Sequence, residues 1–333
     1  MAPMQLHFVT GSNQVYFPTL MLMLQSFAEQ VGGTLPFVCD YGLAPGQREF
    51  LRRRGLLLER PSALGPPMAP LHEKTILRDY FRHSGIDIGA ADAVVWLDAD
   101  LTFVGCSRGD FEQAAAEMCQ RNVEIAASRQ ASFGWIIKAV RSLGPAIDPF
   151  EQLLDTGSID GTRPYYSGGL FICRSPDFLD RWAALSRGAP ERPVFDQNVL
   201  NAVIYRGEMP VLPLDIDIWQ AQGVTLDRVR VVPDPILGRG SVQLDGRPVK
   251  ILHATSPSPG HVLAGHASFV AGDLVLDGAF KLLRAQPLLD LQLALLSRFM
   301  AEHRTELLEI GLCRLAPTAI AVYELRIAGT GGD

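Results

Sequence analysis

The chain has 333 residues, of which 47% are hydrophobic and 20% are charged. This is the composition of a globular protein with a sizeable core, and it excludes a largely disordered chain. The formal net charge of −6 provides no concentrated basic face. We therefore expect no nucleic-acid partner.

The cysteines and the apolar segments bear on the cellular compartment. Five cysteines are scattered along the chain without the paired spacing of a metal or redox motif, which indicates reduced thiols in a reducing compartment. The opening MAPMQLHFVTGS lacks the basic and apolar regions of a signal peptide. No uninterrupted apolar run approaches the roughly 18 residues of a membrane-spanning helix. The sequence therefore predicts a cytoplasmic protein.

Short apolar runs alternate with segments of helical spacing in the first part of the chain. Strands are expected at residues 5–10, 35–39, 56–58, 93–97, 101–104 and 123–127. Helices are expected at residues 18–30, 45–54, 71–82 and 111–121, with a loop at 62–70. This alternation favours an α/β fold in which helices cover a mostly parallel sheet.

The pattern weakens after residue 128 and changes near the C-terminus. An amphipathic segment is expected at residues 133–143, a strand at 165–174, helices at 176–186 and 196–205, and short strands near 211, 229 and 249–253. Residues 278–312 are leucine-rich with helical spacing. We therefore expect a main domain over residues 1–275 and a helical C-terminal extension over residues 276–333.

Two interpretations of this extension stay open. Its apolar helices pack on the main domain or on a second copy in a homodimer, or they lie on a membrane surface and make the protein membrane-associated. Lys281, Arg284, Asp290 and Arg298 interrupt the apolar residues. So few basic residues argue against strong membrane binding.

Asp98 and Asp100 are the first candidates for chemistry, because they directly follow the apolar run VVWL. Alternate residues of an extended strand point the same way, and ligands bind at the carboxyl ends of strands in open α/β sheets. Carboxylate oxygens suit Mg²⁺ or Mn²⁺, and His253, which ends the run VKIL, offers a third ligand. A polar strand end and a hydrogen-bonded structural histidine are the alternatives.

Two further segments stand out. Gly168 and Gly169 enter an apolar strand, which indicates that another group approaches the backbone closely there, either a sugar ring or a packed helix. Asp196 and Gln197 begin a helical segment. The aspartate is a good helix N-cap, and the pair could equally hold sugar hydroxyls.

The order VVWLDAD, YYSGGLFI, FDQNVLNAV and KILHATSPSPGH resembles the GT-A glycosyltransferases, and among them glycosyltransferase family 8, over residues 6–261. The resemblance implies a Rossmann-like GT-A fold, a nucleotide-sugar donor of the UDP-sugar type, and Mn²⁺ or Mg²⁺. It also implies a hydroxyl acceptor, such as a glycan or a lipid-linked saccharide.

The same resemblance assigns roles to residues of this chain. It implies that Asp98, Asp100 and His253 hold the metal ion, and that Asp196 and Gln197 lie close to the anomeric carbon. The remaining donor-site residues that it implies are Thr10, Gly11, Ser12, Asn13, Tyr16, Lys74, Arg78, Ala99, Ser167, Gly168 and Gly169.

The chain departs from the family pattern at two places. Tyr166 stands where the family usually has asparagine, and the lysine that normally contacts the diphosphate is missing after His253. Arg78 and His261 are candidates to replace that lysine. If the reaction retains configuration, as in family 8, no dedicated base is needed. If it inverts configuration, Asp196 or Asp217 could serve as the base.

Two other functions are alternatives. A sugar nucleotidyltransferase would more often carry a basic residue in the loop after the first strand, and TGSNQVYF has none. The missing lysine leaves open a non-catalytic GT-A relative that binds a sugar or nucleotide. The intact Asp98, Asp100 and His253 argue against it.

Overall fold

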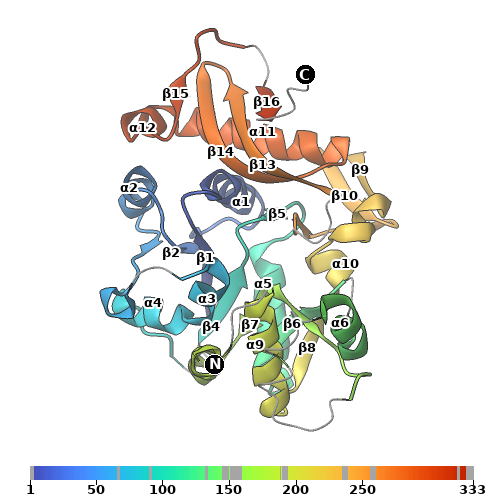
Figure 1. Ribbon diagram of the computed structural model, residues 1–333. Helices are drawn as coiled ribbons and strands as arrows, with labels where there is room; N and C mark the ends of the chain where they lie inside the picture. The colour runs from blue at the N-terminus through green and yellow to red at the C-terminus, as the bar shows by residue number, and fades with distance from the viewer. Residues whose placement is uncertain are drawn as a thin grey trace.

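The computed structural model describes residues 4–65, 68–89, 92–131, 134–144, 150, 160–187, 189, 194–234, 239–255, 260–320 and 323–327. The chain forms a central sheet flanked by helices, and the C-terminal strands and helices form a further layer above α1 (Figure 1). No helix within the described ranges is long and apolar enough to cross a membrane.

The central sheet has seven strands in the order β3-β2-β1-β4-β7-β6-β8. Its strands are β1 (Gln5–Ser12), β2 (Phe37–Asp40), β3 (Leu57–Leu58), β4 (Asp92–Leu97), β6 (Ile125–Arg129), β7 (Tyr166–Cys173) and β8 (Val211–Leu214). Only β7 runs antiparallel to its two neighbours in this sheet, and the other paired strands are parallel. The expected α/β fold with a mostly parallel sheet is confirmed.

Helices cover both faces of this sheet, so its central strand β4 is apolar from Ala93 to Leu97. The helices of the main domain are α1 (Phe17–Gln30), α2 (Pro45–Arg53), α3 (Pro70–Thr75), α4 (Leu77–His83), α5 (Arg108–Gln120), α6 (Ile136–Leu143), α8 (Pro176–Ser186), α9 (Phe195–Arg206) and α10 (Ile216–Trp219). On β4, Val95 and Leu97 join the core formed with α1 and α5. Val94 and Trp96 join the core formed with α4, α8 and α9. A strand buried on both faces reads as a continuous apolar run.

Most elements lie where the sequence predicts them, but the helix expected at residues 71–82 is interrupted. It forms α3 and α4, because Ile76 leaves the helical conformation with φ −97° and ψ 24°. The amphipathic segment expected at 133–143 forms α6 from Ile136 onward. Phe133, residues 66–67 of the expected loop and residues 256–259 after His253 lie outside the described residues.

Two smaller sheets extend the main domain. Strand β5 (Leu101–Phe103) pairs antiparallel with β12 (Ile251–His253), and this pairing sets His253 opposite Leu101. The other small sheet comprises β9 (Val229–Asp234), β10 (Arg239–Leu244) and β11 (Arg247–Pro248). The β5–β12 pair therefore returns a late segment of the chain to the end of β4.

The expectation of a purely helical C-terminal extension is wrong. Residues 278–283 belong to β14 (Leu274–Leu283), which pairs with β13 (Val262–Ala271) in a four-stranded antiparallel sheet, and the boundary expected at residue 275 falls inside β14. The other elements of this layer are α11 (Gln286–Glu302), α12 (Arg304–Glu309), β15 (Arg314–Leu315) and β16 (Tyr323–Ile327). Both faces of β14 carry buried apolar residues, so its period of two is hidden in the sequence.

The C-terminal layer shares its core with the main domain. Leu296 and Phe299 of α11 are buried in the same apolar cluster as Leu20 and Phe27 of α1. The apolar face of α11 is therefore covered by this chain itself. Of the two interpretations of the leucine-rich segment, packing on the main domain accounts for these residues.

Candidate functional site

Asp98 and Asp100 lie at the carboxyl end of β4, where the chain turns into β5. The backbone amide of Asp98 donates to the Gly169 carbonyl of β7 at 2.9 Å, and the amide of Leu101 donates to the Asp98 carbonyl at 3.2 Å. Residues 99 and 100 therefore form a turn rather than the extended strand expected from the sequence. The two carboxylates still converge, because the turn directs both toward the end of β12.

His253 completes the cluster from β12. Its Nε2 lies 3.1 Å from Asp100 Oδ1 and 3.9 Å from Asp98 Oδ2, and its side chain is 5% exposed. Asp98, Asp100 and His253 each offer one ligand atom, and these atoms lie within 4.8 Å of one another. The three residues that the sequence singled out are thus brought together.

Because Gly168 and Gly169 have no side chains, other side chains of this protein pack directly against their backbone. A Cβ on Gly169 would lie 2.5 Å from His253 Cε1 and 2.8 Å from Gln220 Oε1. A Cβ on Gly168 would lie 2.9 Å from Asp196 Oδ2. The close approach inferred from the two glycines is real, and in the structure the approaching groups belong to this chain.

Lys74 of α3 joins the cluster to the start of α9. Its Nζ lies 2.9 Å from Asp98 Oδ1 and 2.7 Å from Asp196 Oδ2, and it donates to the Gly168 carbonyl at 2.7 Å. Burial disfavours the charged ammonium, but the two carboxylates outweigh burial and raise the pKa of Lys74. Gln197 supports the same segment, because its Oε1 accepts from the Gly168 amide at 3.1 Å.

A second lysine, Lys281 of β14, reaches the cluster from the C-terminal layer. Its Nζ lies 2.9 Å from Asp100 Oδ2. The sequence does not predict this contact, because the spacing of residues 278–312 predicts a helix, in which Lys281 would face a different direction. The only indication in the sequence is a charged residue inside an apolar run.

The two aspartates respond differently to their neighbours. Burial raises the pKa of Asp98, although Lys74 opposes that shift and Asp100 adds to it. Burial also works against the ionised form of Asp100, but Lys281 and His253 outweigh it and hold its pKa below the ordinary range. The site thus holds Asp100 as an anion between two basic side chains.

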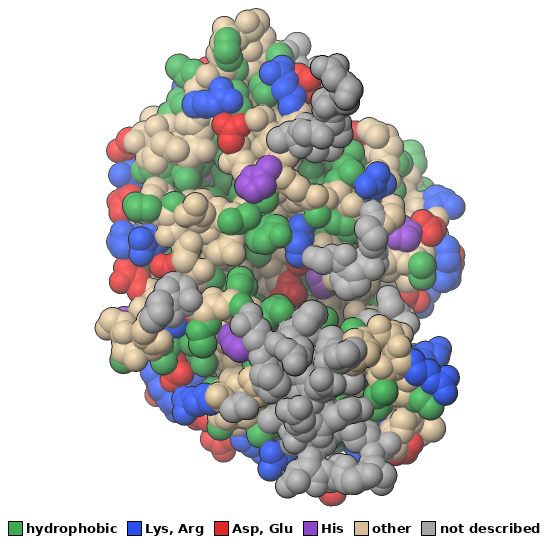
Figure 2. Space-filling model, in the orientation of Figure 1, with side chains coloured by type: hydrophobic (Ala, Val, Ile, Leu, Met, Phe, Trp, Pro, Cys, Tyr) green, Lys and Arg blue, Asp and Glu red, His purple; other side chains and the backbone are tan. Residues whose placement is uncertain are grey.

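A cavity of about 340 Å³ opens above these residues. The residues that line it come from the end of β1, the start of α1, α3, the β4–β5 turn and β14: Gly11, Ser12, Asn13, Tyr16, Thr19, Tyr41, Ala69, Pro70, Leu71, Lys74, Trp96, Asp98, Ala99, Asp100 and Lys281. Figure 2 shows acidic and histidine side chains recessed near the centre of one face of the molecule. Asp98 and Asp100 therefore line an open cavity.

The first loop is shaped by local contacts. Asn13 Oδ1 accepts from the backbone amides of Val15 and Tyr16, both at 3.1 Å. A Cβ on Gly11 would lie 2.2 Å from the Tyr41 ring, so only glycine lets that ring pack there. Thr10 is fully buried in β1 and is not among the described residues that line the cavity.

Several residues implied by the resemblance lie outside the cavity lining. Ser167 is buried, and its hydroxyl donates to Gln220 Oε1 at 3.3 Å. Asp196 and Gln197 lie behind Lys74 and Gly168, which they contact. Asp217 accepts from the Thr225 hydroxyl at 3.1 Å and also does not line the cavity as described.

The structure does not bring Arg78 or His261 to this cavity. Lys74 and Arg78 would share one face of a continuous helix, but the interruption at Ile76 separates them. Arg78 donates instead to the Ile88 carbonyl at 3.4 Å, before β4 begins. Neither residue is among the described residues that line this cavity.

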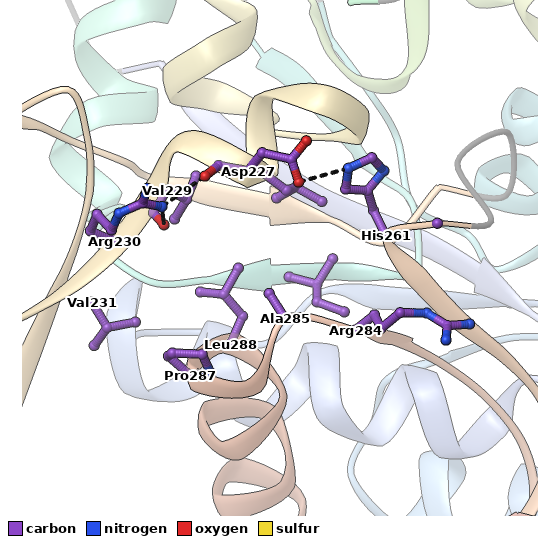
Figure 3. A pocket seen from close by; sticks show the side chains of 12 residues that line it. Asp227, Val229, Arg230, Val231, His261, Arg284, Ala285, Pro287 and Leu288 are labelled. Carbon is purple, nitrogen blue, oxygen red and sulfur yellow. Dashed lines mark hydrogen bonds and ion pairs between the residues drawn. The ribbon is translucent and has the colours of Figure 1, made fainter.

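His261 lines a second cavity of about 440 Å³ between β9 and the start of α11 (Figure 3). Its Nε2 lies 2.9 Å from Asp227 Oδ1. Arg230 and Arg284 lie at opposite ends of the residues drawn, with Pro287 and Leu288 between them (Figure 3). This cavity shares no lining residue with the one above Asp98.

Comparisons with known proteins give matches among solved structures alone. No protein-family model matches the chain, and no curated protein matches its sequence. Similar solved structures include galactosyltransferase LgtC in complex with donor and acceptor sugar analogs, with a TM-score of 0.49 and 15% identity over 91% of this chain and 100% of that chain.

Two other similar structures are glycosyltransferases by name. The bifunctional glycosyltransferase WbbM has a TM-score of 0.45 and 13% identity, over 65% of this chain and 40% of its own length. Mouse xyloside xylosyltransferase 1 has a TM-score of 0.38 and 13% identity, over 76% of this chain and 99% of its own length.

Proposed function

We propose that this protein is a glycosyltransferase that moves a sugar from a nucleotide-sugar donor to a hydroxyl acceptor with the help of a divalent metal ion. The observation that carries the proposal is the convergence of Asp98, Asp100 and His253 beside a cavity that the two aspartates line. Lys74 and Lys281 line the same cavity. Ligands for a cation and lysines for an anion thus lie side by side, as binding of a metal–diphosphate requires.

The cluster suits Mn²⁺ or Mg²⁺. Two carboxylates and an imidazole form a donor set that Mn²⁺ accepts, and Mg²⁺ is also bound by one or two carboxylates together with substrate phosphates. The His253 ring packs directly against Gly169, and a side chain at position 169 would occupy the space of the ring. A divalent ion bound there would stabilise the negative charge that grows on the departing diphosphate.

The cavity also suits a nucleoside. Tyr16 and Leu71 both line it, are 38% and 39% exposed, and would present apolar surface to a planar base. Gly11, Ser12 and Asn13 line the same cavity and would supply polar groups to base and ribose. We propose UDP as the nucleotide, in line with the resemblance of the motifs.

Retention of configuration is the proposed stereochemical outcome. An inverting enzyme needs a carboxylate base free to accept the proton of the acceptor hydroxyl. Among the described residues that line the cavity, the carboxylates are Asp98 and Asp100, and both belong to the metal cluster. Asp196 is engaged by Lys74 at 2.7 Å. A retaining reaction, in which the leaving phosphate takes the proton, asks for no further base.

The proposed acceptor is a hydroxyl group, in line with the resemblance of the motifs. A glycan or lipid-linked saccharide supplies the hydroxyl, and transfer in the cytoplasm is consistent with the scattered cysteines. A non-catalytic sugar- or nucleotide-binding protein would have no need of a complete metal cluster beside two lysines. A sugar nucleotidyltransferase would more often have a basic residue in the first loop, and residues 11–16 contain none.

The test is the thermal stability of the purified protein with a panel of nucleoside diphosphates and UDP-sugars, in Mn²⁺ or in EDTA. Ligand at 100 times its dissociation constant should stabilise the fold by about 2.7 kcal/mol. We expect UDP and Mn²⁺ together to give this shift, and Asp100→Ala to abolish it.

Asp227→Ala is the matched control, because it removes a carboxylate that contacts a histidine outside this cavity. It should leave the shift intact. If no nucleotide raises the stability of the unmodified protein, the glycosyltransferase proposal fails.

A further inference from the structure

Strand β14 is attached to the first loop and to α1 at three successive points. The Ala279 amide donates to the Val15 carbonyl at 3.2 Å, and the Lys281 amide donates to the Thr19 hydroxyl at 3.0 Å. A Cβ on Gly278 would lie 2.5 Å from Pro18 Cγ, so glycine is needed for this close approach. The backbone of Lys281 is thereby fixed at the wall of the cavity.

The side chain of Lys281 is held far less firmly than its backbone. Its Nζ contacts Asp100 Oδ2 as its only carboxylate partner among the described residues, and the side chain is 20% exposed. Lys74 differs, because it has three acceptors and is 4% exposed. Of the two lysines that line the cavity, Lys281 can change partner with the smaller loss of contacts.

Both carboxylate oxygens of Asp100 have partners within this chain. One of its oxygens faces Lys281 and the other faces His253. A divalent ion at Asp100 would therefore approach an ammonium group that already neutralises the carboxylate, and like charges a few ångströms apart repel. A diphosphate in the same cavity offers that ammonium an alternative anion.

We propose that Lys281 exchanges between Asp100 and the diphosphate of the donor, and so couples metal binding to nucleotide binding. This inference rests on the proposed function. The flexible four-carbon stem of lysine allows the ammonium to change partner while the backbone stays on β14. By linkage, the metal strengthens nucleotide binding by the same factor as the nucleotide strengthens metal binding. The C-terminal layer is then part of the donor site.

The test measures three affinities in Lys281→Gln and in the unmodified protein: Mn²⁺ alone by electron paramagnetic resonance, UDP alone, and UDP at saturating Mn²⁺ by calorimetry. Lys281→Gln should bind Mn²⁺ alone more tightly, because Asp100 loses its competing partner. UDP affinity at saturating Mn²⁺ should fall about 10-fold or more, the effect of losing a hydrogen bond to a charged group. UDP affinity without metal should change little.

Two further variants separate the proposal from a structural role. Lys281→Arg keeps the charge and should restore most of the coupling. Lys250→Gln also removes a partly exposed lysine from an ion pair, with Asp110 at 2.8 Å and 25% exposure of the lysine, but outside the cavity. It should leave all three affinities unchanged.

The possible outcomes distinguish this inference from the proposed function. If Lys281→Gln lowers UDP affinity equally with and without Mn²⁺, or leaves Mn²⁺ affinity unchanged, Lys281 is a fixed cation and the exchange is refuted. The same holds if Lys281→Gln merely lowers stability as Lys250→Gln does. If the unmodified protein binds no UDP with Mn²⁺, the proposed function fails and the inference fails with it.

Discussion

The two sides of the site are built in different ways. What we call its floor is the cluster at the carboxyl end of β4, where Asp98, His253 and Lys74 each contact more than one neighbour and where Gly168 and Gly169 leave no spare room. The wall contributed by β14 presents one partly exposed lysine with a single carboxylate contact. A floor fixed by many contacts can position reacting groups, whereas a wall with an adjustable charge can respond to what binds.

Replacing Lys74 tests the floor most severely. Lys74→Gln leaves the buried Asp196 carboxylate without its cation, and we expect the free energy of unfolding to fall by about 3–5 kcal/mol in chemical denaturation. The double variant Lys74→Gln/Asp196→Asn should recover part of this loss, because it removes the uncompensated charge. A loss below about 1 kcal/mol, as expected for an exposed pair, would remove the distinction between floor and wall.

Removing a carboxylate from the floor should affect chemistry more than folding. Asp98→Asn keeps the shape of the side chain but removes one charge from the metal cluster. We expect the rate of sugar transfer to fall by about 10²-fold or more, which corresponds to about 2.7 kcal/mol of transition-state stabilisation. The release of UDP from a UDP-sugar measures this rate. Asp227→Asn is the control, and near-normal transfer by Asp98→Asn would show that this aspartate does not serve the reaction.

Gly169→Ala sharpens the comparison by disturbing the floor without changing any charge. The new Cβ would overlap His253 Cε1 at 2.5 Å, so the imidazole has to move away from its present position. We expect Mn²⁺ affinity to fall about 10-fold, in the range seen when the support of a metal ligand is lost. Gly260→Ala should have no effect, because no atom of the described residues lies within 4 Å of its added Cβ. Unchanged Mn²⁺ affinity in Gly169→Ala would argue against His253 as a ligand.

The smallest effect is expected where the C-terminal layer meets α1 at the surface. Arg298 contacts Glu29 at 2.8 Å, and the arginine side chain is 47% exposed. Arg298→Ala should change the free energy of unfolding by less than about 1 kcal/mol, since exposed ion pairs contribute little. Thermal denaturation at two salt concentrations measures this. A loss of several kcal/mol would mean that charge, rather than apolar contact, holds the layer in place.

The sequence predicted the floor well and the wall poorly. Asp98, Asp100 and His253 each follow an apolar run, so the strand ends were visible and their convergence could be expected. Gly169 signalled a close approach, but the identity of the approaching His253 depends on the β5–β12 pairing. The local spacing of residues does not show which distant segments of the chain come into contact.

Lys281 and Arg78 show why the positions of some side chains could not be predicted from the sequence. Strand β14 (residues 274–283) has apolar residues on both faces, so its sequence is compatible with helical spacing. The side of the strand on which Lys281 lies could therefore not be predicted. Arg78 was placed with Lys74 because positions four apart share a helix face. The break at Ile76 has no proline or glycine beside it, so the local sequence does not signal it.

The attachment of β14 to the first loop also constrains how this chain can change. A deletion that removed residues 276–333 would uncover the apolar side of α1 and withdraw Lys281 from the cavity in one step. Truncation for crystallisation, or exchange of the C-terminal layer with that of another protein, would therefore alter solubility and ligand affinity together. Because α1 packs against both the main domain and the C-terminal layer, we expect the layer to evolve together with the rest of the chain.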